Sequence, residues 1–232
     1  MPVLDTKAVL PLLESTTMRM IAHAQTLKGA NQTWPDDDVR TSFFSKFTNV
    51  LLSTQLALTF SVNELKTDAW WETHFPAIYQ AMASQNPAAF QFHAAFFRNL
   101  SMNSCFHFTF SVAESSVRQI ALAVLNYKNL NFNRVYKKLF NDLSVPNEIE
   151  AFDFIRHVRN TIHNNGFHTA PDALVMYRGV NYAFVEGDRP AFVDWSVLAA
   201  CLEDIGNSMY ELALIPRVAA VSAIKDVHDH AV

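Results

Sequence analysis

The sequence predicts a mainly α-helical protein with one small β-hairpin. Half of the 232 residues are hydrophobic and only 17% are charged, so the chain can bury a large core and is not disordered. Apolar residues recur with the 3.6-residue period of helices over most of its length. The chain has only five glycines, too few for the many tight turns of a β-sandwich. Its length fits one domain, or one domain with a helical extension.

The first part of the chain is predicted to form two long helices. The first covers residues 11–27 and ends near Gly29, because glycine is common just past a helix C-terminus. Asp36–Asp38 then provide a cap and first-turn carboxylates for a helix that continues to about Leu65. Apolar residues recur every three or four positions in this second helix, which indicates a buried face.

Shorter helical segments are expected next. Asp68 would cap a helix that is interrupted or restarted at Pro76, since proline is tolerated only in a first turn. Asn86-Pro87 marks a further start. Residues 105–127 carry a broad apolar stripe and are predicted as a helix, although the alternating phenylalanines at their start resemble a strand.

Two helices follow in the second half of the chain. The first is short and covers Asn133–Leu143. The second runs from about Asn147 to His163 and ends at Asn164–Gly166, a sequence typical of helix C-termini. This second helix carries the residues on which the functional prediction depends.

The pattern changes after this helix. Residues 173–178 and 182–186 are β-prone runs joined around Gly179, which predicts one hairpin. Helical periodicity returns over residues 190–214. Residues 217–232 are expected to form a frayed tail.

Charge and cysteine content exclude several functional classes. The net charge is −4, so the chain has no strongly basic domain that could bind duplex nucleic acid through charge alone. Any contact with RNA must come from a local cluster of residues. Cys105 and Cys201 are far apart and lack the spacing of metal ligands, so we expect reduced core thiols of a cytoplasmic protein. The first residues resemble no signal peptide, and no run of about 20 apolar residues predicts a membrane helix.

A candidate catalytic constellation lies in the sequence FDFIRHVRNTIHNNGFH, which starts at Phe152. On a helix, Arg156, Asn160 and His163 stack on nearly one line, because they are spaced by four and then three residues. Arg159 lies beside them. Two guanidinium groups, an amide and an imidazole therefore share one helix face.

These residue types suit RNA cleavage without a metal or other cofactor. Arg156 and Arg159 can hold a phosphate through charge-assisted hydrogen bonds, and His163 can give or take a proton near neutral pH. Asn160 can orient the phosphate or the attacking 2′-hydroxyl. The structural alternative is that a helix ending in arginine and histidine complements its own dipole and solvates its outer face.

The segment resembles the motif helix of the HEPN superfamily, whose signature is arginine, a polar residue, and histidine after four to six intervening positions. Arg156, His157 and His163 match it with six intervening residues. The phrase from Val158 to Gly166 is also similar to the "RN…H" phrase of uncharacterised bacterial members. In that alignment Arg159 leads and His163 follows after only three residues, so the sequence leaves open which arginine is the motif arginine.

Residues 108–120 resemble an earlier long helix of such proteins, which often carries a "Glu…Arg" phrase. In those folds this helix packs near the motif helix. The resemblance therefore implies that Glu114 pairs with Arg156 or Arg159 and supports the site, together with Arg118. The alternative is a simple pair between Glu114 and Arg118 within one helix, worth about 0.3–0.5 kcal/mol when exposed.

The resemblance covers residues 100–215 and implies an HEPN-like helical bundle with an N-terminal helical extension and a β-hairpin. It also implies a metal-independent RNA endonuclease of the kind found among toxins and abortive-infection effectors. Such a protein would be a homodimer with adjacent motif helices and would have a cognate antitoxin or other protein partner. Two alternatives stay open: a non-catalytic HEPN-like module that binds RNA, a nucleotide or a protein, and a purely structural helical protein.

Three parts of the chain are expected. Residues 1–99 would form a helical region packed on the rest, residues 100–215 the HEPN-like domain with its hairpin near 173–186, and residues 216–232 a flexible tail. Histidines outside the constellation are expected to pack in the core or lie in the tail without a third metal ligand nearby: His23, His74, His93, His107, His228 and His230.

Overall fold

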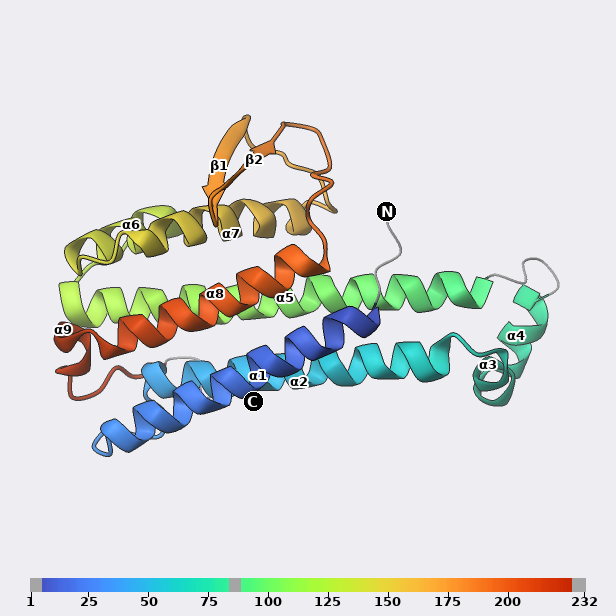
Figure 1. Cartoon of the computed structure of the whole chain (residues 1–232), viewed down its shortest axis with the longest axis horizontal. Coiled ribbons are helices and arrows are strands. Elements are labelled where there is room, and N and C mark those ends of the chain that lie inside the picture. The colour runs from blue at the N-terminus through green and yellow to red at the C-terminus, as the bar shows by residue number, and fades with distance from the viewer. Residues whose placement is uncertain (1–5, 84–88, 227–232) are drawn as a thin grey trace.

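The computed structural model describes residues 6–83 and 89–226. Over these ranges the protein is mainly helical, with one two-stranded antiparallel sheet (Figure 1). The described elements are α1 (Thr6–Ala30), α2 (Val39–Phe60), the π-helical turn η1 (Ser61–Leu65), α3 (Asp68–His74), α4 (Pro76–Ala83), α5 (Ala89–Leu125), α6 (Phe132–Asp142), α7 (Asn147–His163), β1 (Ala173–Tyr177), β2 (Val180–Phe184), α8 (Trp195–Leu214) and α9 (Pro216–Ala219).

The helices lie in layers (Figure 1). α1 packs on α2 and on α8, and α2 packs on α5. On the other side of α5 lie α6 and α7, and the hairpin covers α7. α3 and α4 pack on each other at the end of the molecule where α2 meets the start of α5. α1 and α2 are thus packed on the later helices α5 and α8.

α5 is a single helix of 37 residues, where the sequence predicts a separate start and a later patterned stretch. It crosses the expected boundary between residues 99 and 100 without a break. Two serines inside it are compatible with the helix because their hydroxyls donate to carbonyl groups one turn earlier, Ser101 to Phe97 and Ser111 to His107. The start predicted at Asn86-Pro87 lies outside the described residues.

α5 and α7 are antiparallel neighbours, as expected. His107 of α5 lies beside His163 at the end of α7, and Phe110 lies under the guanidinium of Arg159, so rising numbers in one helix meet falling numbers in the other. The apolar residues expected at this interface all belong to the core, four of them fully buried and two partly: Val117, Ile120, Ile155, Val158, Val124 and Ile162.

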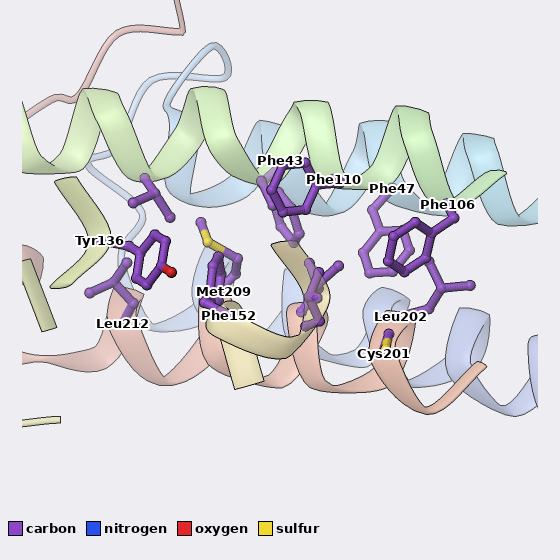
Figure 2. Close-up of a cluster of buried hydrophobic side chains, with 14 of the residues drawn as sticks. Phe43, Phe47, Phe106, Phe110, Tyr136, Phe152, Cys201, Leu202, Met209 and Leu212 are labelled. Atoms are coloured by element: carbon purple, nitrogen blue, oxygen red, sulfur yellow. The ribbon is translucent and has the colours of Figure 1, made fainter. Parts of the chain in front are cut away.

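The core is rich in phenylalanine, and its central part draws on α2, α5, α6, α7 and α8. Figure 2 shows side chains from α2, α5, α6, α7 and α8 that meet between the layers. The labelled residues are Phe43, Phe47, Phe106, Phe110, Tyr136, Phe152, Cys201, Leu202, Met209 and Leu212. All of them are almost completely buried, and burying a large apolar side chain stabilises the fold by about 1.5–3 kcal/mol. Both cysteines are buried and unpaired.

The hairpin forms at the predicted place. Arg178 and Gly179 have positive φ angles of 49° and 75°, the geometry of the tight turn favoured between two antiparallel strands. The ring of Tyr177 stacks on Phe154 of α7, with ring centres 4.2 Å apart. Arg178 also pairs with Asp204 of α8, at 2.6 Å. The hairpin is therefore fixed to both α7 and α8.

The segment after α8 differs from the predicted tail. α8 begins at Trp195 with Asp194 as its cap, five residues later than predicted, and is followed by α9. Ile224 and Asp226 are buried, and the amide of Val39 donates to the carbonyl of Ile224 at 2.8 Å. Residues 216–226 are therefore packed against the start of α2. Residues 227–232, with His228 and His230, lie outside the described residues.

Candidate functional site

The structure gives the two candidate arginines different surroundings. All four predicted residues lie on the last two turns of α7, where Arg156, Arg159 and Asn160 are half-buried and His163 is exposed. Arg156 contacts the ring nitrogen Nε2 of His157 at 2.8 Å and lies 3.9 Å from the carboxylate of Asp153.

The carboxylate of Asp153 is itself part of a network. It accepts a hydrogen bond from the hydroxyl of Tyr136 and pairs with Lys137 at 2.9 Å. Burial, followed by the carboxylate, raises the pKa of Tyr136 well above its usual value, so the phenol stays protonated and donates. Arg156 is thus committed to an internal network that joins α6 and α7.

Arg159 has no such carboxylate. Its guanidinium lies 5.9 Å from the ring centre of Phe110, and its Nη1 donates a weak hydrogen bond of 3.3 Å to Asn160 Oδ1. Its Nε is buried and has no hydrogen-bond partner among the residues that the structure describes, and the same holds for the Nε of Arg156, so it is the carboxylate contact and not the Nε that distinguishes the two arginines. No acidic group in residues 6–83 or 89–226 lies within ion-pair distance of Arg159. Arg159 therefore keeps donors for an anion, as a phosphate ligand requires.

A second histidine joins the site from α5. The rings of His107 and His163 are nearly parallel, at 10°, with centres 6.1 Å apart. Burial lowers the pKa of His107, and Arg159 and His163 lower it further. His107 is therefore neutral at pH 7 and able to accept a proton. The sequence predicts His107 as a packing residue, because nothing local indicates that another helix brings an imidazole beside it.

Glu114 and Arg118 bond to each other rather than to α7. Glu114 Oε1 accepts hydrogen bonds from Arg118 Nε at 3.0 Å and Nη2 at 2.6 Å. Arg118 Nη1 also donates to the carbonyl of Asn129 at 2.6 Å, in the loop between α5 and α6. The expected support of Arg156 or Arg159 by Glu114 is therefore not what the structure shows, and the alternative of a pair within one helix holds.

A further histidine pair lies behind the site. His157 and His168 are buried against Phe184, with imidazole centres 5.5 Å apart. Burial lowers the pKa of His157 to about 4, helped by the positive charge of Arg156. This ring is thus neutral at pH 7. The pair is too deeply buried to meet a large ligand, and it packs the end of α7 against the hairpin.

The accessible cluster therefore consists of His107, Arg159, Asn160 and His163. Two imidazoles can move protons beside a guanidinium that can hold an oxyanion. Within residues 6–83 and 89–226, no group of three His, Cys, Asp or Glu side chains could hold a metal ion. No helix in the same ranges is long and apolar enough to cross a membrane.

The chain was compared with protein-family models, curated proteins and solved structures. No protein-family model, curated protein or solved structure matches the chain.

Proposed function

We propose that the protein is a metal-independent RNA endonuclease with an HEPN-like fold, and that His107, Arg159 and His163 are its catalytic residues. The observation that carries the proposal is the parallel pair of imidazoles, 6.1 Å apart, next to an arginine that has no carboxylate partner in the described part of the chain. The pair can reach opposite sides of one phosphate, and the arginine supplies the positive charge that a phosphoryl transition state requires.

The proposed reaction is an internal transfer of the phosphate. Neutral His107 takes the proton of the ribose 2′-hydroxyl, and the oxygen attacks the adjacent phosphorus. The bond from phosphorus to the 5′-oxygen breaks, and His163, as the general acid, gives a proton to that leaving oxygen. Arg159 stabilises the charge that develops on the phosphate oxygens, and Asn160 orients the guanidinium through the bond to its Nη1. The products are a 2′,3′-cyclic phosphate and a 5′-hydroxyl.

The resemblance also leads us to propose a homodimer. Phe92, Phe96 and Leu100 are each more than half exposed, on the part of α5 that precedes His107. Exposed apolar residues at helical spacing are typical of an interaction surface. Light scattering at micromolar concentration is expected to report twice the chain mass of 26.2 kDa, and a strict monomer would contradict this part of the proposal.

The activity is tested with a labelled single-stranded RNA in excess EDTA. We expect cleavage that leaves a 2′,3′-cyclic phosphate. His163→Ala and His107→Ala should each slow it about 10²–10⁴-fold, as expected for loss of a general acid or base. His74→Ala, at an exposed histidine of α3, is the matched control and should retain full activity.

Circular dichroism of each variant must first show an intact fold. Cleavage that persists unchanged in His163→Ala, or that requires a divalent metal, would refute the proposed mechanism. RNA binding without any cleavage would instead favour a non-catalytic binding module.

A further inference from the structure

The loop that follows α7 is held in one conformation close to the proposed catalytic cluster. The amide of Gly166 donates to the carbonyl of Thr161 at 2.8 Å, and the side chain of Asn164 donates to the hydroxyl of Thr169 at 2.8 Å. The backbone of His168 exchanges hydrogen bonds with Gly187 and Asp188, at 2.7 and 2.8 Å. The segment between β2 and α8 is thus tied to the loop that ends α7.

This tie places an aromatic ring and a guanidinium together at the surface. The guanidinium carbon of Arg189 lies 4.2 Å from the ring centre of Phe167, and both side chains are exposed. Gly166, just before Phe167, has a φ of +90°, which disfavours other residues, and a Cβ there would be in ordinary van der Waals contact with Arg189 Nε, at 3.8 Å.

Both side chains lie at the surface, outside the hydrophobic core. An exposed phenylalanine contributes little to the core, and a cation–π contact in water is weak. Within residues 6–83 and 89–226, no carboxylate lies within ion-pair distance of Arg189. The guanidinium therefore keeps its positive charge and its planar surface available to a ligand.

Phe167 comes four residues after His163, and its amide donates to the carbonyl of Asn164 at 3.1 Å, so this pair starts in the turn that directly follows the helix of the proposed function. A strand whose phosphate contacts Arg159 and His163 would bring its neighbouring nucleotide to the loop. Single-stranded bases stack on aromatic rings and on arginine planes, whereas the bases of a duplex are already stacked and covered.

We propose that Phe167 and Arg189 form a subsite that binds the nucleotide next to the scissile phosphate, and that the ligand is single-stranded RNA. The base stacks on this pair, and the charge of Arg189 attracts the flanking phosphate. The subsite rests on the proposed function for its position but is tested separately from cleavage.

The test measures binding of a fluorescent 2′-O-methyl RNA, which has no 2′-hydroxyl and cannot be cleaved. Fluorescence anisotropy should show that Phe167→Ala and Arg189→Ala weaken binding about five- to 100-fold, the usual range for one lost stacking contact. Phe167→Tyr keeps a ring and should bind as the wild type does. The control Arg217→Ala, at an exposed position of α9, should also leave the affinity unchanged.

Cleavage of ordinary RNA gives a second readout. Loss of a contact made equally in the ground and transition states raises KM and leaves kcat unchanged, which is the expected behaviour of Phe167→Ala. If Phe167→Ala and Arg189→Ala bind and cleave like the wild type, the subsite is refuted while the endonuclease stands. If the wild type binds the oligonucleotide through Phe167 but cleaves no RNA, the endonuclease is refuted, while the binding of single-stranded RNA by Phe167 and Arg189 stands. Equal affinity for duplex RNA, or no binding of the single strand, would overturn the subsite.

Discussion

The buried pair of Asp38 and Arg40 gives the sharpest prediction on stability. Both side chains are completely buried, and their charged groups lie 2.6 Å apart. Asp38 also accepts hydrogen bonds from the amides of Arg40 and Ile224, at 3.0 and 2.9 Å. One carboxylate thus caps α2, neutralises a buried guanidinium and holds the segment after α9.

Asp38→Ala would leave the charge of Arg40 without its partner inside the protein. Removing one member of a buried ion pair destabilises a protein by about 3–5 kcal/mol, because the remaining charge stays desolvated. Typical domains are stable by only about 5–15 kcal/mol, so we expect a large loss. Arg40 would keep its bonds to the carbonyls of Val218 and Val221, at 2.8 and 2.9 Å, which do not neutralise it.

Urea unfolding followed by circular dichroism measures this loss. The double variant Asp38→Ala with Arg40→Met removes both charges and should be more stable than the summed losses of Asp38→Ala and Arg40→Met predict, since no charge is left unpaired. Asp36→Ala, at a fully exposed carboxylate, is the matched control and should leave the midpoint unchanged. A loss below about 1 kcal/mol in Asp38→Ala would refute the reasoning, because that is the scale of a surface ion pair.

Three further predictions follow from the site and the hairpin. Folding lowers the pKa of His157 from 6.5 to about 4, so the unfolded chain binds more protons than the folded one between these pH values. The free energy of unfolding should therefore fall by up to about 3 kcal/mol as the pH drops through this range. Urea unfolding of His157→Gln at several pH values should lack this part of the pH dependence. Arg159→Ala should reduce RNA cleavage about 10²–10³-fold. Arg156→Ala should mainly reduce the stability of the fold, and Glu114→Ala should leave the cleavage rate unchanged. Equal losses of cleavage rate in Arg156→Ala and Arg159→Ala would contradict the proposal that Arg159 is the catalytic arginine. Gly179→Ala should destabilise the hairpin by about 1–2 kcal/mol because of its positive φ, visible as faster amide exchange in β1 and β2, and unchanged exchange would contradict this.

Local signals predicted most of the secondary structure. The bounds of α7 agree with the prediction because Pro146 and the Asn164–Gly166 stop flank a clear helical period. The hairpin was equally predictable from β-prone residues on both sides of Gly179. The packing of the residues after α8 was not predictable from local sequence. The groups that hydrogen-bond to Ile224 and Asp226 belong to α2 and to the residue pair just before it, 180 or more positions earlier in the chain.

Only the part of the candidate site that lies on α7 was predictable from the sequence. The shared face of Arg159, Asn160 and His163 follows from helical spacing alone. His107 could not be found, since only the packing of α5 on α7 brings its ring beside His163. The choice between the two arginines also needed the structure, because it depends on the carboxylate of Asp153 and its bond to Tyr136.

The hydrogen bonds of Arg40 also bear on how the protein is made. Its acceptor Val221 lies 181 residues further along the chain, so at 5–20 residues per second a ribosome needs about 10–40 s to add it. During that interval Arg40 lacks its carbonyl acceptors, and the start of α2 is not yet covered by residues 216–226. The helical pair of α1 and α2 is therefore translated first but finished last, and chaperones that bind nascent chains would meet it with its apolar face still open.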